Sequence, residues 1–254
     1  MKRHLRRRVW LVLISAIVIF VFAAVYSHIA GLSRRARQPA AAYQIEPIKS
    51  FTFPAPDCLK EWDEKVFKGK VTYEVRSENG QSYVSALSDA SASALYYQVK
   101  VDAKTKYPVV RWKWKAEKFP VKKFEENLDK ENEDDFAARF YVIFPALFIT
   151  NSRVLEYVWA EKLAVGATGT SPYSKNIKLI VLRSGKDEFN QWLSEERDVV
   201  ADYIKMFGRA PDYNIGAIAF MTNTEHTQGT AEAKYDDIEI GYKVDIKKEG
   251  GRTP

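Results

Sequence analysis

Three consecutive acidic residues followed by an arginine form the densest group of side chains in the sequence that could do chemistry. Glu133, Asp134 and Asp135 precede Arg139, which lies among small and aromatic residues. On a strand, Asp135 and Arg139 would point to the same face. An arginine inside a sheet needs a partner of opposite charge. Two interpretations stay open: a structural ion-pair network, or a cleft in which Arg139 meets an anionic or sugar ligand and Asp134 or Asp135 acts as base or hydrogen-bond acceptor.

A second acidic segment supplies the expected partners of Arg139. They are Glu195, Glu196, Asp198 and Asp202 on a predicted helix. Two carboxylates about 5–9 Å apart could also serve as the acid and base of a glycosidase. The candidates for such a pair are Asp134, Asp135, Glu195, Glu196 and Asp198. Because the chain contains 33 acidic residues, some pair will always meet that distance, and whether the protein is an enzyme stays open.

Aromatic residues near loops could stack on a sugar ring. Trp159 and Tyr173 lie beside glycines and polar loop residues, and we expect them to border a ligand cleft. Trp112 and Trp114 alternate on one face of a predicted strand, which is typical of a core.

Residues 222–229 form a polar loop between two predicted strands, rich in hydroxyl and amide groups. Ligand-binding residues are frequent in such loops, and Asn223 is our candidate. His226 is the only histidine after residue 28. A hydrolase triad would need it as base, and no Gly-x-Ser-x-Gly elbow is present. A zinc site needs several nitrogen or sulfur ligands. The sequence therefore predicts a solvated histidine.

Asp236 and Asp237, on the last predicted strand, could bind a structural Ca²⁺ through oxygen ligands. Adjacent strand residues point to opposite faces, so both reach one ion only at a bulge or a strand end. We predict no other cofactor.

An uncharged segment near the N-terminus predicts where the protein lies. Residues 9–27 carry no charge and follow five basic residues. About 20 apolar residues can cross a bilayer, and the basic flank stays in the cytoplasm. We expect a cytoplasmic tail (1–8), an anchor (9–30), a linker (31–50), a folded domain (51–243) and a flexible tail (244–254). A cleaved signal peptide is the alternative for 9–30.

The net charge of +6 comes from this N-terminal region. Residues 1–37 contain eight lysines or arginines and no acid, which leaves 31 basic and 33 acidic residues in the body. A nucleic-acid binder needs a basic patch on its folded domain, so we predict no nucleic-acid partner. Cys58 is the single cysteine, and no intramolecular disulfide can form.

The domain that must position these residues is rich in strands. Alternating apolar residues predict eight strands, at 66–76, 83–87, 95–101, 109–114, 136–144, 177–183, 215–221 and 231–242. Asn79-Gly80 predicts a hairpin turn. Helices are expected at 121–130, at 153–159 and within 188–208, where Gly208 would end the helix. These elements predict a mainly β, jelly-roll-like two-sheet sandwich with two or three inserted helices, preceded by one N-terminal transmembrane helix.

Several short motifs, in their order and spacing, resemble the bacterial DUF3047 family. They include Tyr-Pro-Val-Val-Arg-Trp-Lys-Trp-Lys (107–115), Asp-Asp-Phe-Ala-Ala-Arg-Phe-Tyr-Val (134–142), Glu-Glu-Arg-Asp-Val (195–199) and Ile-Ala-Phe-Met-Thr-Asn-Thr (218–224). The resemblance covers about residues 51–242 and implies an exported bacterial β-rich domain without an assigned activity. Residues 233–240 also resemble the last strand of sandwich domains related to carbohydrate-binding modules and concanavalin-like lectins, at the level of fold only.

Together these observations predict a single-pass protein of the bacterial inner membrane, with its C-terminal domain in the periplasm. We expect non-catalytic recognition of a carbohydrate or another envelope polymer. The alternatives are a carbohydrate-active enzyme that uses paired carboxylates and an envelope scaffold. The candidate ligand-binding residues are Asp134, Asp135, Arg139, Trp159, Tyr173, Glu196, Asp198 and Asn223.

Overall fold

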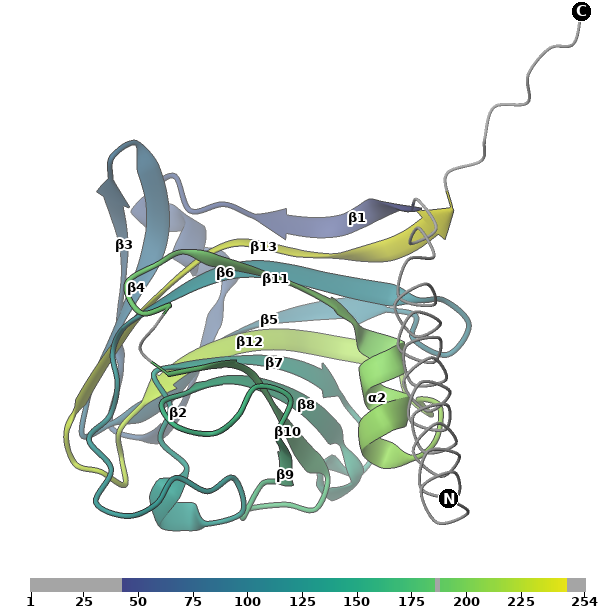
Figure 1. Cartoon of the computed structure of the whole chain (residues 1–254). Coiled ribbons are helices and arrows are strands. Elements are labelled where there is room, and N and C mark those ends of the chain that lie inside the picture. The colour runs from purple at the N-terminus through teal and green to yellow at the C-terminus, as the bar shows by residue number, and fades with distance from the viewer. Residues whose placement is uncertain (1–42, 186–187, 246–254) are drawn as a thin grey trace, which may run out of the picture. The chain divides into compact units, whose positions relative to one another are not determined.

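The computed structural model describes residues 43–185 and 188–245 (Figure 1). The predicted cytoplasmic tail, the predicted anchor and most of the predicted C-terminal tail lie outside these residues. Within the described residues, no helix has the length and apolar character that a membrane crossing requires. The compact unit that carries the sites runs from Gln44 to Val244.

Two β-sheets make up this unit (Figure 1). Sheet A has the order β11 (Leu193–Asp198), β6 (Pro108–Lys118), β13 (Thr230–Asp245), β4 (Gln81–Asp89) and β3 (Thr72–Glu78), and β1 (Tyr43–Phe51) also pairs with β13. Sheet B has the order β2 (Asp63–Lys68), β5 (Ala92–Val101), β12 (Ile215–Asn223), β7 (Ala138–Phe144), β8 (Arg153–Ala160), β10 (Ile177–Ser184) and β9 (Thr168–Thr170). The predicted two-sheet sandwich with few helices is confirmed.

The core lies between the sheets and is largely aromatic. Trp112 and Trp114 of β6 point inward, as their alternation predicts, and both are fully buried. The Trp112 ring stacks on Phe140 of sheet B with centroids 4.2 Å apart. Aromatic pairs of this kind add to the stabilisation from buried apolar area. They therefore hold the two sheets in a fixed relation.

The prediction of one strand over 66–76 is wrong, because the chain changes sheets within it. Gly69 adopts a φ of +63°, which glycine tolerates without strain. Residues before it form β2 of sheet B, and residues after it form β3 of sheet A. The predicted hairpin turn is confirmed between β3 and β4, where Asn79 and Gly80 have φ values of 52° and 82°.

Two predicted helices are also wrong. Residues 121–130 contain no helix, and residues 153–160 form β8. Leu155 and Tyr157 of β8 pack into the core between the sheets, whereas Val158 belongs to a second apolar cluster on the opposite face. A strand buried on both faces lacks the apolar–polar alternation that distinguishes it from a helix.

The third predicted helix is shorter than expected. Only Val199–Phe207 is helical (α2), and residues 193–198 before it form β11. The Asp198 side chain accepts a hydrogen bond from the Ala201 N–H at 3.0 Å and caps the helix. Gly208 ends it with a φ of +73°, as predicted. Short 3₁₀ turns lie at Pro56–Glu61, Glu131–Glu133 and Ile149–Asn151.

The predicted linker over 31–50 is too long. Its last eight residues belong to β1, which pairs with β13 at the edge of sheet A. The polar composition of the segment concealed a strand with one partner and a mostly exposed surface.

Candidate functional site

The outer face of sheet B, turned away from the core, carries the site. Strand register aligns Tyr96, Ala219, Tyr141 and Glu156 in one row across β5, β12, β7 and β8. The alternate row, Leu95, Phe220, Phe140 and Tyr157, packs into the core between the sheets, so the first row must point outward. Tyr96 and Tyr141 are half-buried and flank the small Ala219. Two strand spacings place their backbones about 10 Å apart.

Arg139 lies in the next row of this face and is 3% exposed. Its guanidinium forms a bidentate ion pair with the Asp134 carboxylate, with Nη2–oxygen distances of 3.1 Å. Its Nε donates to Glu156 Oε1 at 2.5 Å, and its Nη1 donates to Asn223 Oδ1 at 3.1 Å. Charge-assisted bonds of this geometry are the strongest hydrogen bonds in proteins. Asp134, which the sequence suggested as a base or hydrogen-bond acceptor toward a ligand, is instead an ion-pair partner of Arg139, and Glu156 is a second partner that the sequence did not reveal.

The expectation that acidic residues of a helix pair with Arg139 is wrong. Glu195 binds Arg183, Glu196 binds Arg111, and Asp202 binds Arg197. Asp198 caps α2. Glu195, Glu196 and Asp198 belong to sheet A, whereas Arg139 points away from the core on the outer face of sheet B. The core therefore separates the two acidic segments, and no glycosidase pair can combine them.

Asn223, at the end of β12, joins the parts of the network. Its Nδ2 donates to the Asp134 carbonyl at 2.7 Å, to Asp135 Oδ1 at 3.0 Å and to Glu225 Oε2 at 2.9 Å. The Asp135 carboxylate also accepts from the backbone N–H groups of His226 at 3.1 Å and Thr227 at 2.6 Å. The predicted residues Asp134, Asp135, Arg139 and Asn223 are thus brought together.

Tyr173 reaches the same place from the loop before β10. Its hydroxyl lies 2.5 Å from His226 Nε2, and His226 Nε2 lies 3.5 Å from Glu225 Oε1. Tyr173 is 53% exposed. His226, which the sequence suggested to be solvated, is instead a partly buried member of the cluster.

Trp159 does not border this site, and its prediction as an exposed ring is wrong. It is fully buried in the core, where its ring centroid lies 5.8 Å from that of Trp114. Its place near loops, at the end of a predicted helix, suggested exposure, but residues 153–160 form β8, and alternation with Tyr157 directs Trp159 inward.

Negative charge is in excess around Arg139. Two cations in this part of the described chain, Arg139 and Lys122, are buried, and Lys122 pairs with Glu126 at 3.0 Å. The buried or largely buried carboxylates here are Glu126, Glu133, Asp134, Asp135, Glu156 and Glu225. Glu133 is 1% exposed, and neither of its carboxylate oxygens has a hydrogen-bond partner. Buried charge of one sign is costly unless it is protonated or compensated.

Protonation near neutral pH follows from this excess. Burial raises the pKa of Glu156 to about 7, with Asp134 adding to the rise and Arg139 opposing it. Burial also raises the pKa of Glu225 to about 7, and the Asp135 carboxylate adds to the rise. Burial raises the pKa of Asp134 against the effect of Arg139. Carboxyl groups that titrate near neutrality are frequent in functional sites.

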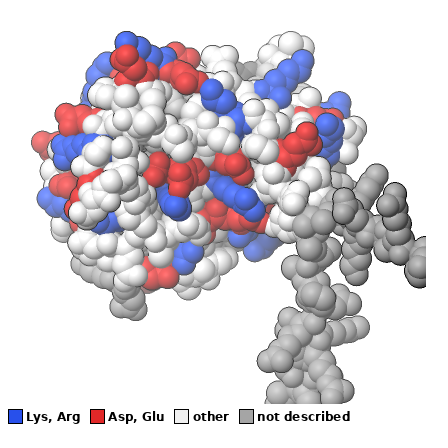
Figure 2. All heavy atoms as spheres, turned by 90° about the horizontal axis from the view of Figure 1, so that it is seen from above, with Lys and Arg blue, Asp and Glu red and all other residues white. Residues whose placement is uncertain are grey.

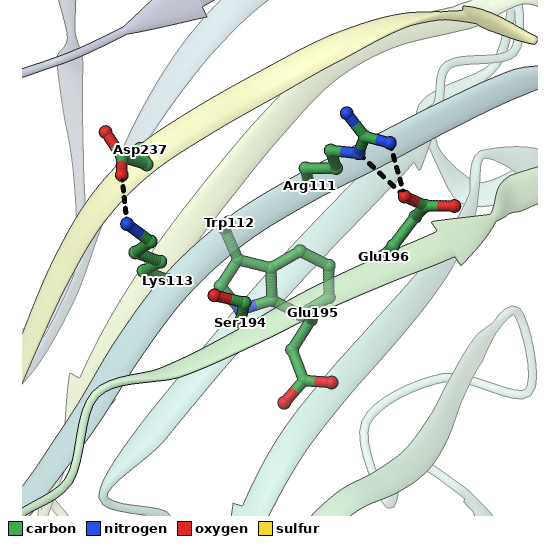
Figure 3. A pocket seen from close by; sticks show the side chains of 7 residues that line it. All are labelled: Arg111, Trp112, Lys113, Ser194, Glu195, Glu196 and Asp237. Carbon is green, nitrogen blue, oxygen red and sulfur yellow. Dashed lines mark hydrogen bonds and ion pairs between the residues drawn. The ribbon is translucent and has the colours of Figure 1, made fainter. Parts of the chain in front are cut away.

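A second polar surface lies on the outer face of sheet A. Figure 2 shows acidic and basic side chains interleaved on one face of the molecule. A pocket of about 230 Å³ is lined by Arg111, Trp112, Lys113, Ser194, Glu195, Glu196 and Asp237 (Figure 3). Arg111 binds Glu196, and Lys113 binds Asp237 at 2.6 Å. These charged residues of the pocket are thus paired within the protein. The predicted ligand-binding residue Glu196 lines this pocket and lies away from Arg139.

Asp236 and Asp237 lie at a bulge of β13, where the register shifts and Asp237 has a φ of 46°. The bulge is the geometry that shared ligation requires. Asp237 is paired with Lys113, and Asp236 Oδ2 accepts from Gln81 Nε2 at 3.0 Å while Oδ1 has no partner. Calcium binding at these residues stays a prediction.

The chain is a two-sheet β-sandwich, and the outer face of sheet B carries the polar network around Arg139. The family described as "Protein of unknown function (DUF3047)" matches residues 60–239. The chain belongs to this family. A search of curated proteins finds no relative.

Several solved structures are similar to this chain at low identity and low structural score. A family 11 carbohydrate-binding module from Clostridium thermocellum, in complex with a β-1,3-1,4-mixed-linked tetrasaccharide, is 11% identical, covers 82% of this chain and 99% of its own, and has a TM-score of 0.41. The cellulose induced protein Cip1 is 10% identical over 76% and 96%, with a TM-score of 0.43. The endoglucanase cel12A from Rhodothermus marinus is 10% identical over 78% and 100%, with a TM-score of 0.42. At these scores the likenesses carry no argument about this chain.

Proposed function

We propose that the protein binds a carbohydrate on the outer face of sheet B. The observation that carries the proposal is the row in which Tyr96 and Tyr141 flank Ala219, beside the polar network of Arg139 and Asn223. Tyrosine rings offer apolar faces to the C–H groups of a sugar, and their hydroxyls can bond to its oxygens. A few fixed polar groups next to apolar surface are typical of small-molecule sites.

The envelope is the setting in which this binding would operate. The uncharged residues 9–27 behind a basic N-terminus support an anchored protein with its domain outside the cytoplasm. The ligand would then be a glycan of the envelope or its surroundings.

Glycan binding by the full-length protein in mild detergent tests the proposal. The probes are soluble mixed-linkage β-glucan, galactomannan and peptidoglycan fragments, first on an array and then by calorimetry. Tyr96→Ala and Tyr141→Leu should each weaken binding at least about tenfold, because truncating an aromatic side chain that dominates a binding surface costs on the order of 2 kcal/mol or more. Tyr107→Ala, at an exposed tyrosine of the loop before β6, is the matched control and should bind as the wild type does.

Two outcomes would overturn the proposal. One is that the wild-type protein retains none of the three probes. The other is that Tyr96→Ala and Tyr141→Leu, with unchanged circular dichroism, bind as tightly as Tyr107→Ala.

Carbohydrate hydrolysis is a second candidate function, because Glu156 and Glu225 both have a pKa of about 7 in one network. A general acid works best when its pKa is near the operating pH. If the protein is a hydrolase, it releases reducing ends from one of the same probes, and Glu225→Gln abolishes the release while Glu125→Gln does not. Binding without any release assigns the protein to recognition alone.

A further inference from the structure

We propose that Asp135, Glu225 and His226 hold a divalent transition-metal ion. One ligand atom of each residue lies within 4.8 Å of the others. Glu225 Oε1 and His226 Nε2 are 3.5 Å apart. A zinc ion bound here would lie about 2.0–2.2 Å from each nitrogen or oxygen ligand, so atoms within 4.8 Å of one another can surround it.

The Asp135 carboxylate is held in place as metal ligands usually are. It is fully buried and accepts from Asn223 Nδ2 and from the N–H groups of His226 and Thr227. A carboxylate offers about four acceptor positions, so these bonds leave capacity for a metal. Outer-shell donors of this kind orient a ligand and are part of a metal site.

Uncompensated charge in the segment that carries Asp135 is an independent observation in favour of a cation. Glu133, two residues before Asp135, is buried and has no hydrogen-bond partner for either carboxylate oxygen. The six carboxylates of this region face only Arg139 and Lys122 as buried cations of the described chain, and Lys122 is engaged by Glu126 and by the Glu133 carbonyl. A divalent ion would offset two of the remaining negative charges in a region where burial strengthens every charge interaction.

The ligand types select the class of ion. An imidazole nitrogen with two carboxylates suits ions from Mn²⁺ to Zn²⁺, whereas Ca²⁺ and Mg²⁺ prefer oxygen ligands alone. The ion takes the Nε2 lone pair that otherwise meets the Tyr173 hydroxyl, and the exposed Tyr173 side chain turns away or becomes a further ligand. This site is distinct from the predicted calcium site at Asp236 and Asp237, which lies on β13 of sheet A and offers carboxylate oxygens without a histidine.

Metal binding by the full-length, tag-free protein in mild detergent tests the proposal. After treatment with EDTA and its removal, Zn²⁺, Mn²⁺ and Ca²⁺ are titrated separately by calorimetry, and bound metal is counted after dialysis. We expect one Zn²⁺ or Mn²⁺ per chain and weaker binding of Ca²⁺. His226→Gln, which keeps His4 and His28, and Glu225→Gln should each weaken Zn²⁺ binding by about 100-fold or more, since even outer-shell changes cost 10–100-fold.

Asp237→Asn is the matched control and should leave Zn²⁺ binding unchanged. The proposal is overturned if the wild-type protein retains no Zn²⁺ or Mn²⁺, if His226→Gln binds as the wild type does, or if Asp237→Asn alone removes the ion. Circular dichroism verifies that each variant is folded. Should His226→Gln fail to fold, Glu225→Gln decides, because this glutamate lies in a partly exposed loop.

Discussion

Arg139 of β7 and Glu156 of β8 form a buried ion pair along a diagonal of the sheet. The residues directly opposite them are Val158 and Tyr141, respectively. The long guanidinium side chain spans this offset and places Nε 2.5 Å from Glu156 Oε1, while its other nitrogens bind Asp134. One arginine thus joins two strands and the segment before β7 on a single face.

Replacing Arg139 by methionine should lower the free energy of unfolding by about 3–5 kcal/mol, because Asp134 and Glu156 would remain buried without their cation. Arg111→Met is the matched control. Arg111 also forms ion pairs, with Glu196 and Glu239, but its side chain is 43% exposed, and exposed pairs contribute about 0–1 kcal/mol. Urea unfolding measures both. Equal losses in the two variants would contradict the assignment of Arg139 as the centre of the network.

The pH dependence of stability should carry the signature of the raised carboxyl groups. Glu225 has a pKa of about 7 in the folded protein, against about 4.3 in the unfolded chain. Between these values the folded state binds more protons, so its stability falls as pH rises through this window and levels off above it.

Glu225→Gln should flatten this decline by on the order of 1–3 kcal/mol between pH 4.5 and 7.5, measured by urea unfolding with EDTA present. The exposed Glu125→Gln is its control and should follow the wild-type curve. A Glu225→Gln curve that coincides with the wild-type curve would show that this carboxyl group titrates normally.

Truncating Trp159 should lower the stability of the protein far more than truncating Tyr173. Trp159→Ala removes a fully buried indole and should cost about 3–5 kcal/mol. Tyr173→Ala removes a half-exposed ring and should change stability by at most about 1 kcal/mol. Thermal unfolding compares them, and a similar melting temperature for the two variants would refute the placement of Trp159 in the core.

Gly241 provides a test of how β1 is attached. A Cβ at this position would lie 2.4 Å from the Glu46 carbonyl oxygen, which is backbone and cannot move aside without displacing β1. Gly241→Ala should therefore loosen β1 from β13, cost about 1–3 kcal/mol, and expose residues 43–51 to limited proteolysis. At Gly229 an added Cβ meets nothing within 4 Å, so Gly229→Ala should be cleaved as slowly as the wild type. Equal cleavage of both variants would mean that β1 tolerates the clash.

The sequence predicted local features well and pairings across strands poorly. Alternation along β6 placed Trp112 and Trp114 in the core, and Gly208 marked the end of α2. Closeness in the chain placed Asp134 and Arg139 in one candidate site, but it did not identify Asp134 as the ion-pair partner of Arg139. Glu156 escaped notice because it lies in an apolar run that resembles a helix as much as a strand, and its register opposite Tyr141 depends on the whole sheet. A single charge within such a run was the available signal.

The polar network joins residues 84–92 positions apart, since Asn223, His226 and Thr227 reach back to Asp135 and Arg139. Contacts so remote in the chain form late, because closing a long loop costs entropy before any bond rewards it. A polypeptide emerging from the ribosome cannot assemble this centre until the strand ending at Asn223 has been synthesised. Fragments that stop before residue 215 can still pair Arg139 with Asp134 and Glu156, but they will lack every contact that Asn223, His226 and Thr227 make.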